Sequence, residues 1–107
     1  MERYVKELYE KAIKLWTPEF QIMMLNEEMA ELTIAINKMM RLKSNDTVVI
    51  DSKLRKIITE IADVKILLEQ MQVLFKIKST DLEEEYFNKL RKMEGMINAD
   101  LKTQAKS

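Results

Sequence analysis

Residues 18–43 read PEFQIMMLNEEMAELTIAINKMMRLK, and their apolar side chains recur at the spacing of an amphipathic helix. At about 100° per residue, with Glu28 taken as zero, the apolar stripe falls within roughly 60° of Glu28. The stripe comprises Gln21 together with Met24, Leu25, Leu32, Ala35, Met39 and Leu42. Glu28 is therefore expected to point from this helix into an apolar core.

The remainder of the chain predicts three more helices, joined by short connections. The expected helical ranges are 2–15, 18–43, 51–76 and 80–99. The expected caps are Thr17 ahead of Pro18, Asp51 or Ser52, and Thr80 with Glu83 in a capping box. Val48-Val49-Ile50 is interpreted as a loop that packs down, and the polar tail 102–107 is expected to fray.

Length and helix pattern together predict an all-α fold, an antiparallel four-helix bundle formed by one domain over residues 1–107. Four amphipathic helices carry more apolar surface than one small bundle can hide. A homodimer or a dimer of dimers is therefore expected to complete the core.

Composition excludes several classes of protein. Lys+Arg and Asp+Glu both number 18, so the chain lacks the basic footprint of a nucleic-acid binder. It has no apolar run of about 18 residues, which predicts that no segment spans a membrane. Because Cys and His are absent, thiolate sites and His-based zinc sites are excluded. A cytoplasmic location is the default expectation.

The third predicted helix repeats the arrangement of the second. Glu60 lies among Ile57, Val64 and Leu67, and Asp63 lies about 60° from it. Glu31 has the same offset from Glu28, so two acidic pairs at i, i+3 spacing fall on apolar stripes. Clustered, buried carboxylates raise one another's pKa or require a cation. An all-oxygen ligand set favours Mg²⁺, with Mn²⁺ as a substitute.

The two acidic motifs are also familiar as a pair. Residues 27–31 (EEMAE) and 60–63 (EIAD) resemble the EExxE…ExxD signature of the MazG-like all-α nucleoside triphosphate pyrophosphohydrolases, in their small single-domain bacterial and phage form. The resemblance covers roughly residues 15–93, with a spacer at the long end of the family's range. It implies hydrolysis of a nucleoside triphosphate between the α- and β-phosphates, giving a nucleoside monophosphate and pyrophosphate.

The resemblance also assigns roles by position. It implies magnesium ligands at Glu28, Glu31, Glu60 and Asp63. Glu27 matches an acid that either supports the ligands or orients a water molecule, and Lys89 is the best match to a basic residue that contacts the phosphates. Lys89 shares a helix face with apolar residues, so it is either a phosphate ligand or a snorkelling, salt-bridged lysine.

Three residues are weaker candidates for binding substrate: Trp16, Gln21 and Lys38. Trp16 either stacks on a nucleobase or anchors the core or an interface, and the second role is favoured because aromatic side chains most often pack. Gln21 and Lys38 match the surroundings of the first acidic motif in the MazG-like family. Base and sugar preference do not follow from the sequence.

Other functions fit the same helices. The acids on the stripes could instead be solvated, with Lys38 or Lys65 as partners of Glu27 and Glu31. A non-enzymatic helical interaction protein would then explain the many Met residues and the amphipathic pattern. A third hypothesis keeps the metal site but applies it to dUTP or dUDP, or to a phosphate ester that is not a nucleotide.

Overall fold

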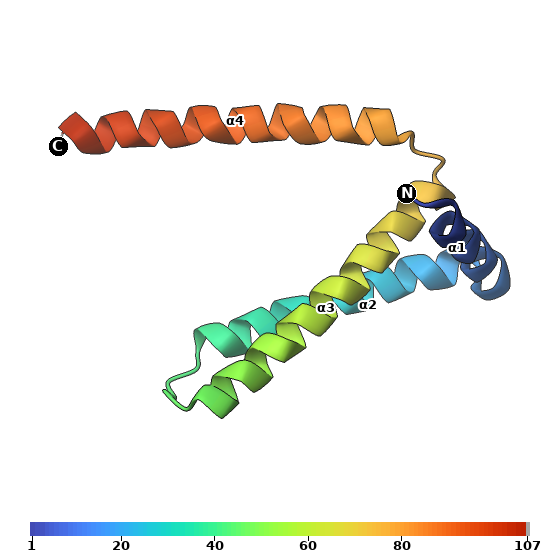
Figure 1. Ribbon diagram of the computed structural model, residues 1–107, viewed down its shortest axis with the longest axis horizontal. Coiled ribbons are helices and arrows are strands. Elements are labelled where there is room, and N and C mark those ends of the chain that lie inside the picture. Colours follow the sequence, from blue (N-terminus) through green and yellow to red (C-terminus); the bar gives the residue numbers. More distant parts are fainter. Residues whose placement is uncertain (107) are drawn as a thin grey trace. The chain divides into compact units, whose positions relative to one another are not determined.

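The computed structural model describes residues 1–106, which form helices joined by short connections (Figure 1). The helices are α1 (Arg3–Trp16), α2 (Pro18–Met40), α3 (Thr47–Leu74) and α4 (Ser79–Lys106). No strand occurs within these residues, which confirms the all-α prediction. None of the described helices is both long and apolar enough to cross a membrane.

The chain divides into two compact units. The first, Met1–Lys76, contains α1, α2 and α3, and the second begins at Ile77 and contains α4. The expectation of one domain over residues 1–107 stays a prediction. Each unit is described below by itself.

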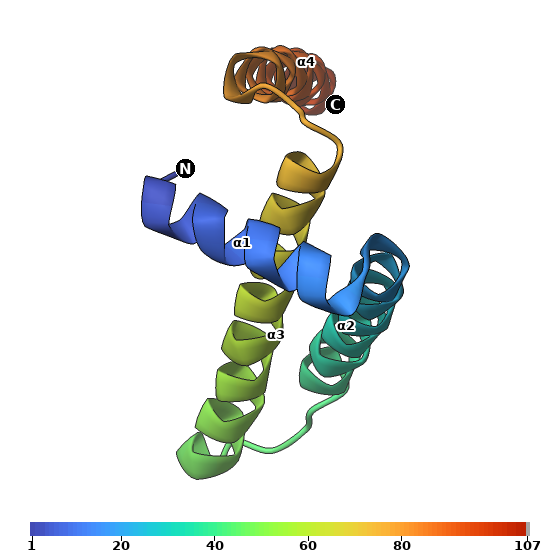
Figure 2. The same cartoon turned by 90° about the vertical axis from the view of Figure 1, so that its right-hand side faces the viewer.

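The centre of the first unit is a hairpin of two long helices. Figures 1 and 2 show α2 and α3 side by side and antiparallel, connected at one end by a short loop. At the other end α1 runs across the pair and packs on both helices (Figure 2). This arrangement turns the apolar stripes of α2 and α3 toward each other and covers one end of the resulting seam.

The turn between α1 and α2 depends on Thr17. Its φ of 71° lies in the left-handed region, which reverses the chain within one residue at some cost in backbone strain. The Oγ1 atom of Thr17 accepts a hydrogen bond from the backbone N–H of Phe20 at 3.2 Å. Pro18 occupies the first turn, where no backbone donor is needed. The predicted cap is confirmed.

The start of α3 differs from the prediction. Asp46 is the N-cap, and its Oδ1 atom accepts from the N–H of Val48 at 2.8 Å. The helix begins at Thr47, so the assignment of the cap to Asp51 or Ser52 is wrong. The Asp46 carboxylate satisfies one of the N–H groups that have no partner within the helix and interacts favourably with the helix dipole, so the helix begins directly after Asp46.

The segment 48–50 is also helical, not a loop. Two of its three side chains, Val49 and Ile50, are half-buried, so their packing outweighs the modest helix propensity of β-branched residues. The second predicted helix extended to Lys43, but α2 ends at Met40.

The last helix is longer at both ends than predicted. It begins at Ser79, one residue ahead of the predicted cap Thr80, and continues to Lys106. Residues 102–106 are helical, Ser107 lies outside the described residues, and the fraying expected of the tail 102–107 stays a prediction. The C-terminal stretch LKTQAK contains good helix formers and no Pro or Gly, which explains the extension.

The core of the first unit is small and unusually polar. Its fully buried side chains are Tyr9, Ala35 and Leu67 together with Gln21, Glu60 and Gln70. The Tyr9 hydroxyl donates a 2.6 Å hydrogen bond to the Glu69 carboxylate, which ties α1 to α3. Burial, with this hydrogen bond, raises the pKa of Tyr9 to about 12.

No side chain of α4 is buried. Its apolar residues Leu82, Tyr86, Leu90, Met93 and Ile97 follow one stripe at intervals of three and four residues. Four of the five are about half exposed, from 49% for Leu82 and Ile97 to 60% for Tyr86. Within its own unit, α4 therefore has an uncovered apolar face.

Candidate metal centre and adjoining groove

Three predicted metal ligands meet across the α2–α3 seam. Glu28 comes from α2, and Glu60 and Asp63 come from consecutive turns of α3. One carboxylate oxygen from each lies within 4.8 Å of the other two. Glu60 is 4% exposed, while Glu28 and Asp63 are half-buried. The antiparallel hairpin thus brings Glu28 together with two acids of which the nearer in sequence, Glu60, lies 32 residues further along the chain.

The two oxygens of Glu60 have different surroundings. Oε1 contacts the Lys56 ammonium at 2.8 Å, one helical turn earlier on α3. Oε2 is buried and has no hydrogen-bond donor when the neighbouring acids are ionised. A buried carboxylate oxygen without a partner costs free energy that a bound cation can offset.

Proximity of the acids changes their protonation. The contact with the Glu60 carboxyl raises the pKa of Glu28, because a protonated Glu28 can donate a hydrogen bond to Glu60. Burial and the negative charges of the neighbouring acids act in the same direction. The Lys56 ammonium holds the pKa of Glu60 below its ordinary value, and the hydrogen bond from Glu28 adds to this effect. Of these two glutamates, Glu28 is thus the one that takes up a proton first.

The donor set fits a hard divalent cation. All three groups are carboxylates, the ligands that Mg²⁺ and Mn²⁺ prefer over nitrogen or sulfur. Water can solvate the half-buried Glu28 and Asp63, so the proximity of these two acids does not by itself indicate a metal site. The buried Oε2 atom of Glu60 is the group that water does not satisfy, and it belongs to the same cluster.

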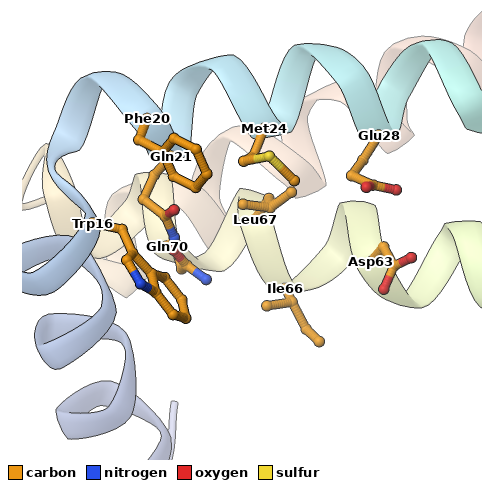
Figure 3. A pocket seen from close by; sticks show the side chains of 9 residues that line it. All are labelled: Trp16, Phe20, Gln21, Met24, Glu28, Asp63, Ile66, Leu67 and Gln70. Carbon is orange, nitrogen blue, oxygen red and sulfur yellow. Dashed lines mark hydrogen bonds between the residues drawn. The ribbon is translucent and has the colours of Figure 1, made fainter.

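An open groove of about 460 Å³ begins at this cluster and extends along the hairpin (Figure 3). Its lining residues are Trp16, Phe20, Gln21, Met24, Glu28, Asp63, Ile66, Leu67 and Gln70. Figure 3 shows Glu28 and Asp63 facing each other at one end, with Trp16 and Phe20 at the other. The groove is thus acidic at one end and aromatic at the other.

A pair of buried amides lies near the aromatic end. Gln21 of α2 donates through its side-chain amide to the side-chain oxygen of Gln70 on α3, and the two are 2% and 6% exposed. Gln21 precedes Glu28 by seven residues, which is about 10 Å along the helix axis. Hydrogen bonding explains why these amides are tolerated inside an apolar seam.

Two other acids that were predicted to belong to the site, Glu31 and Glu27, lie outside the three-acid cluster. Glu31 is exposed and does not belong to the three-acid group, although its charge acts on Glu28 and on Lys56. Glu27 is exposed on the neighbouring face of α2. Their roles in ligation and in orienting water stay predictions.

The two predicted lysines are found on different helices. Lys89 belongs to α4 in the second unit, where its ammonium is 3.7 Å from the Glu85 carboxylate and both side chains are exposed. Lys38 is exposed near the end of α2, ten residues after Glu28, or about 15 Å along the axis. Within the first unit, Trp16 and Gln21 line the groove and Lys38 does not, and the role of Lys89 stays a prediction.

Sequence reasoning missed two residues of this region, Lys56 and Gln70. Lys56 precedes Glu60 by four residues, the spacing at which a lysine reaches a glutamate on the same helix face. Gln70 follows Asp63 by seven residues, as Gln21 precedes Glu28 by seven, so both amides fall on the stripes that carry the acids. The spacing of Lys56 from Glu60 and of Gln70 from Asp63 could therefore have identified both residues from the sequence.

Comparison of the chain with protein-family models, curated proteins and solved structures finds no match in any of the three.

Proposed function

We propose that this chain is a magnesium-dependent nucleoside triphosphate pyrophosphohydrolase, which cleaves NTP or dNTP between the α- and β-phosphates. The observation that carries the proposal is the meeting of Glu28, Glu60 and Asp63 within 4.8 Å, with a buried, unpartnered oxygen among them. The order and spacing of these acids resemble the MazG-like signature, which supplies the reaction.

The groove supports a substrate with one charged and one flat apolar end. Glu28, Glu60 and Asp63, joined by Glu31, would hold Mg²⁺ at the charged end. Bound Mg²⁺ neutralises phosphate charge and lowers the pKa of a bound water, which makes that water a nucleophile. No side-chain nucleophile is required, in accord with a chain that lacks Cys and His.

The other end of the groove suits a nucleoside. Trp16 and Phe20 offer aromatic surface for a base, and Met24 and Leu67 line the space between base and acids (Figure 3). The buried amide of Gln70 lies beside this surface, where a base edge needs hydrogen-bond partners.

Two further groups complete the proposal. Glu27 orients water or supports the ligands, and Lys89, from the same or another subunit, contacts the phosphates. A homodimer or dimer of dimers of MazG-like four-helix type supplies the second subunit, and the uncovered apolar face of α4 favours such association. Nucleotide substrates would place the enzyme in the cytoplasm.

The test is a substrate panel. Purified protein is incubated with each NTP and dNTP plus Mg²⁺, and pyrophosphate and nucleoside monophosphate are both measured. At least one nucleotide should release pyrophosphate in equal amount to the monophosphate. Glu60→Gln should lower the rate by more than the about 10- to 100-fold typical of losing a group that only supports a ligand.

Glu94→Gln is the matched control, because Glu94 is an exposed acid of α4 outside the cluster. Its rate should equal that of the unmodified protein. Absence of pyrophosphate with every nucleotide, from protein that keeps its helical circular dichroism, would overturn the proposal. Hydrolysis of dUDP to dUMP and free phosphate, with no reaction of any triphosphate, would redirect it to the diphosphate substrate.

A second candidate function has one observation in its favour. The exposed apolar stripe of α4 suits a helix that docks on a partner, as expected of a non-enzymatic interaction protein. In that case Glu28→Gln and Glu60→Gln would leave partner binding intact, and Mg²⁺ would cause no thermal shift.

A further inference from the structure

Lys56 is the cation that the fold places at the acidic cluster. Within residues 1–106 the ion pairs are Arg3–Glu7, Lys56–Glu60 and Lys89–Glu85. Only the second involves an acid of the cluster. The charges of Glu31 and Glu28 also act on the Lys56 ammonium, so it lies in the field of three predicted metal ligands.

This ion pair differs from the other two in burial. The Glu60 side chain is 5% exposed, whereas Glu7 and Glu85 are 55% and 62% exposed. Exposed i, i+4 pairs contribute little because water solvates both charges equally well. Water does not solvate Glu60 in this way, so the ammonium supplies the partner of one oxygen while the other oxygen has none.

Lys56 can also leave the pair at low cost. Its side chain is 58% exposed, so the ammonium is well hydrated once it moves away from Glu60. The Glu60 carboxylate has no such alternative, because it remains inside the seam. A divalent cation that reached the cluster would therefore replace the Lys56 ammonium as the partner of Glu60. The Glu60 carboxylate would stay in place, because it is buried.

We propose that Lys56 is the resident counter-cation of the acidic cluster, which a divalent metal ion displaces from Glu60 on binding. The inference rests on the proposed metal site. The displaced ammonium stays beside the cluster on its flexible stem, where the phosphates of a substrate provide its next partner. Lys56 thus lowers the affinity of the cluster for a metal ion when no substrate is present. An anionic substrate, by binding the displaced ammonium, raises that affinity.

The test measures Mn²⁺ binding without nucleotide, by calorimetry and by the electron paramagnetic resonance signal of free Mn²⁺, at pH 8. Lys56→Met should bind Mn²⁺ about three- to tenfold more tightly, the size expected for removing one cation beside a partly exposed site. Lys56→Arg keeps the charge and should bind within about twofold of the unmodified protein.

Lys65→Met is the matched control. It removes the same charge from the same helix, but Lys65 is exposed and lies about 140° around α3 from Glu60. Its affinity for Mn²⁺ should not change. An increase equal to that of Lys56→Met would show an effect of net charge alone and would overturn the inference.

A second measurement uses the unmodified protein, in case Lys56→Met folds poorly. The ¹⁵N resonance of the Lys56 ammonium, assigned by its loss in Lys56→Arg, should move toward those of solvated lysines when Mg²⁺ is added. Metal binding with no movement of this resonance, or with unchanged affinity in folded Lys56→Met, would overturn the inference but leave the metal site standing. Failure of the unmodified protein to bind any metal would overturn both.

Discussion

Helices α3 and α4 each have 28 residues, yet they place their polar groups in opposite ways. The inward face of α3 carries Glu60 and Gln70 beside Leu67, and all three side chains are buried. The stripe of α4, from Leu82 to Ile97, is apolar at its centre, and none of its side chains is buried. The inward face of α3 thus encloses a charged group, whereas the apolar stripe of α4 is left uncovered.

The difference shows how to separate a site from a packing surface in a helical protein. An apolar stripe needs only a covering partner, and any apolar surface of the right shape can provide one. A carboxylate inside a stripe costs free energy unless a specific group compensates it, so its presence indicates chemistry. The clearest functional signal in this chain is therefore Glu60, a charged residue that is costly to bury and yet lies on the apolar, inward face of α3.

The contrast between α3 and α4 predicts a large difference in how much each helix contributes to stability. Leu67→Ala should lower the free energy of unfolding by about 2–3 kcal/mol, near the lower end for a buried leucine because Leu67 also lines the open groove. Leu101→Ala, at a position that is 56% exposed on α4, should stay within about 0.5 kcal/mol. Urea denaturation monitored by circular dichroism measures both. Equal losses would mean that α4 is covered in solution as fully as α3.

Helical spacing predicted the main features of the fold and of the acidic centre. The stripes of α2 and α3 placed Glu28, Glu60 and Asp63 on facing surfaces, and the structure brings them together. The positions of helix ends were less accessible, because they depend on single side-chain hydrogen bonds. At α3 the predicted cap was Asp51 or Ser52, whereas the side chain that accepts from a backbone N–H is that of Asp46.

The remaining differences come from contacts between distant residues. The hydrogen bond between Gln21 and Gln70 joins two residues that lie 49 positions apart in sequence. Helical spacing places each amide on the inward stripe of its own helix, but it does not show that the two amides pair. Lys56 is different, since its four-residue spacing from Glu60 is local. Helical spacing predicted the burial of Glu60, which makes this ion pair unlike the exposed pairs of α1 and α4, but the prediction did not include Lys56 as its partner.

The second effect concerns the apolar stripe of α4. If a second copy of the chain covers it, Met93→Lys should weaken self-association at least about tenfold, because a lysine at the centre of an interface must be desolvated. Asn98→Lys adds the same charge about 140° around the helix from Met93 and should leave association unchanged. Sedimentation equilibrium measures both. A monomeric unmodified protein would contradict the expected dimer and would favour a different partner for α4.

The smallest effect is a pH dependence of stability, and it follows from the raised pKa of Glu28 in the α2–α3 seam. A carboxyl whose pKa is raised on folding contributes stability in full below its ordinary value of 4.5 and loses it as the pH rises through the raised value. Metal-free protein should therefore become more stable as the pH falls from neutral toward 4.5.

The pKa of Glu60 is lowered by Lys56, so its contribution is lost only as the pH falls below 4.5 and does not obscure this window. Glu28→Gln should remove the gain, and the difference between the two urea-denaturation curves at each pH isolates it. Excess Mg²⁺ should reverse the trend of the unmodified protein, because protons then compete with the metal for the same oxygens. Parallel pH profiles for Glu28→Gln and the unmodified protein would mean that Glu28 ionises independently of Glu60. The acids of the α2–α3 seam would then be as solvated as those of α4.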